Sequence, residues 1–176
     1  MIETVKRSIT SQYEAGLCTI YYCVARCPDA LWNSRVAKYP FCQAAFHALF
    51  YADYYLSPEP DAFRTQPFHL AHAAFFGDYE QLEDREPVGV YEKLAIQAYV
   101  RFCRDKAIET LAAETAEDLE AKTKFNRKDF SRLEAHIYNI RHLQHHSAQL
   151  SLRLRLDSDV DTPWIGAGWR EPGVGK

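Results

Sequence analysis

Two histidines, His142 and His146, stand four residues apart in a periodic segment that predicts a long helix. Residues at this spacing lie on one helix face, one turn apart, so their imidazoles can bind a single divalent metal ion. At about 100° per residue, Leu143, Leu150 and Leu154 fall within about 40° of one another and define the inward face. His146 lies roughly 40° from Leu150, so we expect it to be at least partly buried.

The spacing of this pair is weak support for a metal site when taken alone, because hydrogen-bonded core histidines can produce the same pattern. Two neighbouring imidazoles that face a core repel each other when protonated, and when neutral they leave ring nitrogens to be satisfied. A divalent cation bound by neutral imidazoles resolves both problems. The pair therefore favours a metal, with satisfied core histidines as the alternative.

A third ligand has to come from another helix, and His47 is the candidate. It is the one histidine in the segment 41–56, which is apolar almost all round and is expected in the middle of a bundle. A hydrogen-bonded core histidine is the alternative interpretation of His47. Three histidine ligands leave a coordination position for water, which distinguishes a catalytic metal site from a structural one.

The other histidines are expected to serve different roles. His136 falls close to the leucine stripe and is expected to be a satisfied core histidine, whereas His145 points roughly away from His142 and His146. His69 and His72 lie in a long connection and are expected at the surface. Geometry on the predicted helix suggests four supporting or acid–base groups near the site: Tyr138, Asn139, Arg141 and Gln149.

Four long helices must position these side chains, and they are expected at residues 2–26, 41–56, 91–113 and 128–156. The first two end at Pro28 and at Ser57-Pro58, because proline interrupts a helix. Ser131 and Glu134 have the spacing of a capping box at the start of the last one. Residues 91–113 predict one apolar face, formed by Leu94, Ala95, Ala98, Phe102, Ile108 and Leu111.

The remaining segments connect or follow these helices. Residues 57–90 are rich in proline and aromatic residues, which indicates a packed connection with a short helix around 69–76. Residues 114–127 form a polar stretch. The irregular tail, 157–176, carries two tryptophans and is expected to pack on the same domain as residues 1–156. The expected fold is all-α, with one core.

Composition excludes several classes of protein. The chain has 176 residues and a formal charge of −3, from 21 Lys and Arg against 24 Asp and Glu, so it lacks the basic surface that nucleic acids require. No segment predicts a membrane span or a signal peptide, and we expect a cytoplasmic protein. The five cysteines fit neither a complete disulfide set nor a zinc ribbon, and no chemistry is assigned to them.

The two histidine segments resemble those of the DinB-like superfamily. One histidine stands in the second helix, within Phe46-His47-Ala-Leu-Phe-Tyr-Ala-Asp53, and the last helix carries Asn-x-x-His-x-x-His-His-x-x-Gln-Leu, residues 139–150. The resemblance implies an up-down-down-up four-helix bundle, often dimeric, that holds nickel or zinc through His47, His142 and His146. Ser147-Ala148 replaces the Arg-Gly that often follows the last ligand in this family.

Some relatives in that family are transferases or isomerases that use a low-molecular-weight thiol, so the resemblance implies a metal-dependent enzyme of transferase or hydrolase type. Its small-molecule substrate is not readable from the chain. The alternatives are a non-catalytic metal-binding or interaction protein and a bundle without metal. A homodimer is also expected, with Tyr21, Tyr22 and Tyr99 as aromatic residues that could line its interface.

Overall fold

The protein is all-α apart from one small hairpin, in a computed structural model that describes residues 1–36, 39–77, 89–125 and 129–171. Its long helices are α1 (Ile2–Arg26), α3 (Phe41–Leu56), α7 (Lys93–Ala113) and α9 (Arg132–Ser158). The shorter helices are α2 (Asp29–Trp32), α4 (Pro60–Thr65), α5 (Pro67–Ala71), α6 (Ala73–Phe76) and α8 (Ala116–Glu120). Strands β1 (Arg35–Val36) and β2 (Tyr39–Pro40) pair antiparallel.

The helix ends follow the local signals. Cys27, which precedes a proline, is extended and ends α1, and Ser57 is extended and ends α3 before Pro58. Both ends lie where the sequence predicts them. Ser131 caps α9, because its Oγ accepts a hydrogen bond of 3.2 Å from the backbone N–H of Glu134.

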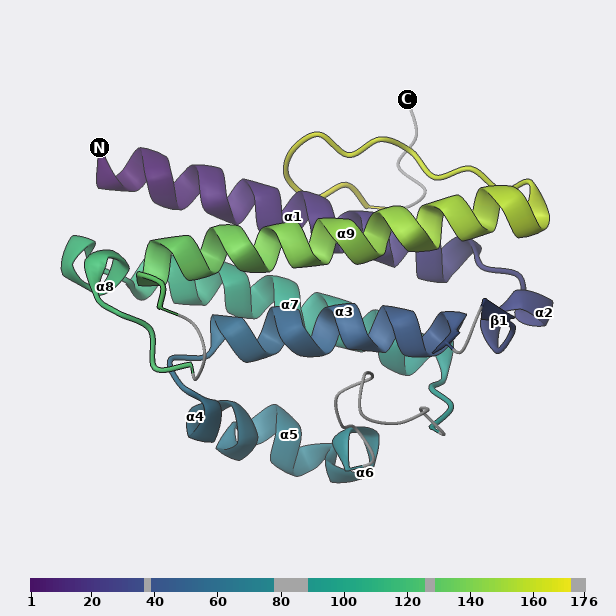
Figure 1. Ribbon diagram of the computed structural model, residues 1–176, viewed down its shortest axis with the longest axis horizontal. Coiled ribbons are helices and arrows are strands. Elements are labelled where there is room, and N and C mark those ends of the chain that lie inside the picture. The colour runs from purple at the N-terminus through teal and green to yellow at the C-terminus, as the bar shows by residue number, and fades with distance from the viewer. Residues whose placement is uncertain (37–38, 78–88, 126–128, 172–176) are drawn as a thin grey trace.

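The four long helices pack side by side, with α1 and α3 each in contact with both α7 and α9. Figure 1 shows α1 and α9 running in one direction and α3 and α7 in the other. All four contribute to one hydrophobic core. Leu143, Leu150 and Leu154 are completely buried in it, which confirms the predicted inward face of α9.

The predicted inward face of α7 is wrong. Two of the predicted positions, Leu94 and Ile108, are exposed, and the exposed fraction of Leu94 is 79%. Leu111 is buried, as predicted. The buried face is formed instead by Ile96, Tyr99, Val100, Cys103, Ala107 and Leu111. Tyr99 belongs inside because its hydroxyl donates a hydrogen bond of 2.8 Å to the buried Asp53. It is fully buried and cannot line a dimer interface.

The described part of the connection after α3 packs against the helices, as expected, and contains α4, α5 and α6; residues 78–88 of the expected connection lie outside the described residues. The predicted surface position of His69 is wrong, because this residue is only 8% exposed and lies 3.5 Å from Asp53. Asp53 also accepts hydrogen bonds from Gln66 and Lys106. Burial alone raises the pKa of Asp53, but His69, Lys106 and Gln66 more than offset this and hold the pKa below its usual value.

The polar stretch after α7 contains a helix that the sequence analysis did not predict, α8, which begins with a capping box between Thr115 and Asp118. Beside it, Arg132 anchors the start of α9 to the end of α3. Its guanidinium donates to the carbonyl oxygens of Tyr55 at 2.7 Å and Leu56 at 2.8 Å. These carbonyl groups belong to the last turn of α3, so they accept no hydrogen bond from within the helix.

The described part of the C-terminal tail, residues 159–171, lies along α1 (Figure 1), and residues 172–176 lie outside the described residues. Ile165 is buried, and the Trp169 ring packs edge-on against Tyr21 with 5.5 Å between ring centres. The N–H of Gly168 donates to the carbonyl oxygen of Ser11 at 3.0 Å, and Gly168 has a φ of 66°, which suits glycine. Trp164, in contrast, is 81% exposed.

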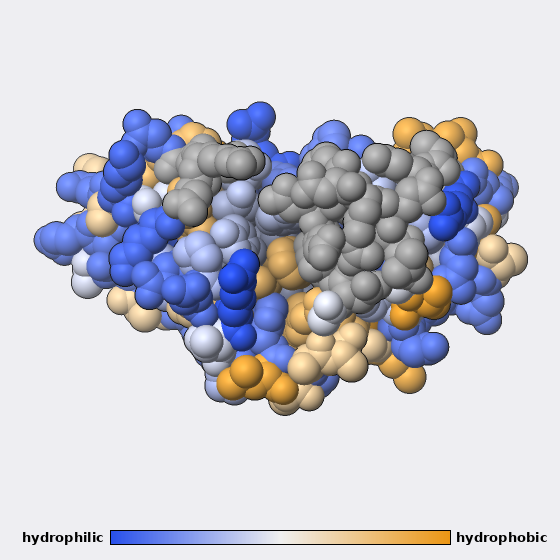
Figure 2. Space-filling view, turned by 60° about the horizontal axis from the view of Figure 1, so that its bottom comes forward, coloured by the Kyte–Doolittle hydropathy of each residue, from blue (hydrophilic) through white to orange (hydrophobic). Residues whose placement is uncertain are grey.

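The surface is mixed in character. Figure 2 shows hydrophilic residues over the left part of one face and hydrophobic residues gathered along its lower edge. Three tyrosines were candidates for a dimer interface. Tyr21 is buried against the tail and Tyr99 is buried in the core, whereas Tyr22 is partly exposed. The homodimer stays a prediction. Among the described residues, no helix combines the length and hydropathy needed to cross a membrane.

Candidate metal centre

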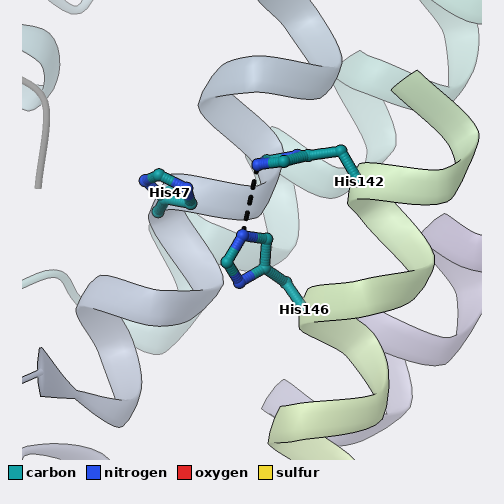
Figure 3. Close-up of side chains that lie close together, drawn as sticks. All are labelled: His47, His142 and His146. Atoms are coloured by element: carbon teal, nitrogen blue, oxygen red, sulfur yellow. Dashed lines mark hydrogen bonds between the residues drawn. The ribbon is translucent and has the colours of Figure 1, made fainter. Parts of the chain in front are cut away.

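Two helices bring together the three histidines singled out in the sequence. His47 comes from the middle of α3, and His142 and His146 come from successive turns of α9 (Figure 3). Each residue offers a ring nitrogen, and these nitrogens all lie within 4.8 Å of one another. The Nε2 atoms of His142 and His146 are 3.2 Å apart. No other group of this kind occurs in the described part of the chain.

The environment favours the neutral form of His47 and His146. His47 is 6% exposed, whereas His142 and His146 are half-buried. Burial, assisted by His146 and His142, lowers the pKa of His47 to about 2. Burial and the neighbouring His145 lower the pKa of His146 to about 4. Both rings are therefore neutral at pH 7, which is the form of histidine that binds metal ions.

The nitrogen positions fit one divalent ion. With zinc–nitrogen bonds of about 2.0–2.1 Å, two ligands of a tetrahedral site lie about 3.3 Å apart. The separation of 3.2 Å between the Nε2 atoms of His142 and His146 matches that value. The nitrogen offered by His47 lies within 4.8 Å of the other two, so a shift of at most about 1.5 Å completes the set. The three imidazoles are thus a suitable donor set.

An aromatic wall that the sequence analysis missed stands beside the histidines. Tyr51 packs edge-on against His47 and His142, with ring centres 4.9 Å and 5.2 Å apart. Its ring also lies beside Tyr55, which contacts Tyr138 of α9 at 5.3 Å. The spacing of four residues between His47 and Tyr51 could have identified this neighbour, because it places both on one face of α3.

The four supporting groups expected around the site have different surroundings. Gln149 contacts the histidine cluster directly, with its Oε1 3.0 Å from Nδ1 of His146. Asn139 is fully buried and donates a hydrogen bond of 3.0 Å to the carbonyl oxygen of Ala52, so it links α9 to α3. Tyr138 joins the aromatic wall, and Arg141 is exposed.

His136 contrasts with the three clustered histidines. It is completely buried, and the Tyr13 hydroxyl donates to its Nδ1 at 3.1 Å while its Nε2 donates to Glu114 at 2.9 Å. Protein groups thus satisfy both ring nitrogens, which confirms the expectation of a satisfied core histidine. His72 and His145 are exposed.

The five cysteines are free and buried. Burial raises the pKa of Cys23 to about 12 and that of Cys27 to about 11. Both side chains are therefore protonated thiols at neutral pH, and a thiol in this form is neither a good nucleophile nor a metal ligand.

No protein-family model, curated protein or solved structure matches this chain. The candidate site therefore stands on its own geometry: three imidazoles from two helices, with ring nitrogens within 4.8 Å of one another.

Proposed function

We propose that the protein is a metal-dependent enzyme of the DinB-like type, folded as an up-down-down-up four-helix bundle. His47, His142 and His146 would hold one divalent ion, nickel or zinc. The observation that carries the proposal is the convergence of three ring nitrogens from α3 and α9 within 4.8 Å. Imidazole suits both metals, so the donor set does not choose between them.

The chemistry proposed is transfer or hydrolysis. A divalent ion at this site would lower the pKa of a water molecule or of a low-molecular-weight thiol, which supplies a nucleophile near neutral pH. The chain's own part is to hold three neutral imidazoles in place and to leave one side of the site accessible. His142 and His146 are half-buried, which supports an accessible side.

A second candidate function is structural. The ligands come from two different helices, so an ion would link α3 to α9 and contribute to folding without catalysis. The two candidates differ in whether the bound ion accepts a further ligand from solution.

Metal content tests the site itself. The untagged protein, its His142→Ala variant and a His72→Ala control are purified in parallel and analysed by mass spectrometry. We expect about one equivalent of metal in the wild type and in the control, because His72 is exposed and distant in sequence from the cluster. His142→Ala should lose the metal. Absence of metal in the wild type, even after incubation with nickel and zinc, would overturn the proposal.

Cobalt substitution distinguishes the enzyme from the structural candidate. Cobalt(II) reports its ligands through its visible absorption, and a thiolate that joins the site adds a charge-transfer band. We expect such a band when a small thiol is added to the cobalt-loaded protein. A spectrum that does not respond to thiols or to azide would favour the structural role of the ion.

A further inference from the structure

We infer that Gln149 is a positioning residue that holds His146 in the one ring form able to bind a metal through Nε2. This inference rests on the proposed metal site. The Gln149 side-chain amide lies between two histidines of the same helix. Its Oε1 is 3.0 Å from Nδ1 of His146, and its Nε2 is 3.0 Å from Nε2 of His145.

The direction of each hydrogen bond follows from the chemistry of the amide. The carbonyl oxygen of Gln149 can only accept, so Nδ1 of His146 must carry the proton and donate it. The amide nitrogen can only donate, and it donates to Nε2 of His145. A neutral His146 with its proton on Nδ1 has its lone pair on Nε2, the atom that lies 3.2 Å from Nε2 of His142.

The opposite orientation of the amide has a different consequence. The amide nitrogen would then donate to Nδ1 of His146, and the single proton of the neutral ring would move to Nε2. That proton would point into the histidine cluster and occupy the position of a metal. The placement of the Gln149 oxygen thus decides whether His146 presents a lone pair or a proton to the site.

The arrangement is local to α9. Gln149 is three residues from His146 and four from His145, and side chains at these spacings are neighbours on a helix. Gln149 is exposed and takes no part in the core. Replacing it therefore changes the hydrogen bond to His146 with little effect on folding, which separates a positioning role from a structural one.

The tautomer can be measured without any metal. Nitrogen-15 NMR of the histidine rings in the metal-free protein distinguishes a proton on Nδ1 from one on Nε2. We expect His146 to be protonated on Nδ1 in the wild type and to lose this preference in Gln149→Met, which keeps the length of the side chain but removes the acceptor. A wild-type His146 protonated on Nε2 would overturn the inference.

Metal affinity supplies the second readout. Partners of ligating histidines change metal affinity by about 10–100-fold, so Gln149→Met should weaken nickel or zinc binding by that factor in a competition titration. Gln149→Glu retains an acceptor for His146 and should bind within a few-fold of the wild type. Gln144→Met, an exposed position on the same helix, is the matched control and should bind like the wild type.

The outcomes separate the two hypotheses. Equal affinity of Gln149→Met and the wild type contradicts the positioning role while leaving the metal site intact. A wild type that binds no metal contradicts the proposed function, and the NMR measurement then still decides which nitrogen of His146 carries the proton.

Discussion

Replacing Gly16 by alanine should destabilise the protein, although the same change usually stabilises a helix. Gly16 lies within α1, where alanine is favoured by about 1 kcal/mol. An added Cβ, however, would lie 2.8 Å from Cδ2 and 3.2 Å from Cγ of Leu143. Carbon atoms normally approach to about 3.5–4.0 Å, so the new methyl group overlaps the leucine side chain.

We expect the overlap to outweigh the helix preference for alanine, because Leu143 is completely buried and its side chain has little space to move into. Overpacking of a core costs about 1–3 kcal/mol, which exceeds the helix preference and leaves a net loss of about 1 kcal/mol. For a chain of this size, that loss lowers the melting temperature by about 2–4 °C. Urea denaturation followed by circular dichroism measures it directly.

A second background tests the cause of the effect. In a Leu143→Ala protein, the atoms that Gly16→Ala would overlap are absent. There the same substitution should become neutral or stabilising, by up to about 1 kcal/mol. If Gly16→Ala stabilises the wild type as well, α1 and α9 do not pack through Gly16 and Leu143 as described, and the reasoning is refuted.

Three further predictions concern the buried polar groups. Asp53→Ala should cost about 3–5 kcal/mol in urea denaturation, because it removes the carboxylate that balances the charge of the largely buried Lys106; a loss under about 1 kcal/mol would contradict this. Folding lowers the pKa values of Asp53 and Glu114, so their contribution to stability is complete above a pH of about 5 and is lost progressively below it. The free energy of unfolding should thus fall between pH 5 and pH 3, and an unchanged value would argue against both networks. Tyr13→Phe should cost about 1–3 kcal/mol in thermal unfolding, because it removes the donor to His136; an unchanged melting temperature would show that the bond contributes nothing.

The parts of the fold that sequence reasoning predicted depend on signals within one element. Proline after Cys27 and after Ser57 ends α1 and α3 where expected, and Ser131 caps α9. The leucine stripe of α9 is periodic over several turns, so the burial of Leu143 follows from its position alone. His146, measured against the same stripe, is partly buried as expected.

The predictions that are wrong concern residues whose burial depends on contacts between elements. The inward face of α7 is marked by Tyr99, a residue with a polar group, and its burial depends on Asp53 of another helix. The burial of His69 likewise depends on Asp53, which lies in a different helix, so the sequence around His69 does not indicate it. A buried carboxylate needs hydrogen-bond donors from several elements, and the local sequence pattern does not indicate which residues supply them.

The anchor formed by Arg132 has a consequence for the axial register of the two helices that carry the histidines. It fixes the start of α9 at the carbonyl oxygens that end α3. With a rise of 1.5 Å per residue, His47 lies about 14 Å along α3 from Leu56, and His142 lies about 15 Å along α9 from Arg132. The two histidines are level because the two lengths are nearly equal.

Asn139, which lies between Arg132 and His142, also links α9 to α3 through its hydrogen bond to the carbonyl oxygen of Ala52. Deleting one residue from α9 between Arg132 and His142 would displace both α9 imidazoles by 1.5 Å and turn them by about 100° around the helix. The spacing between anchor and ligand is therefore nearly the same in the two helices, and a change of length in one moves its ligands out of level with those of the other.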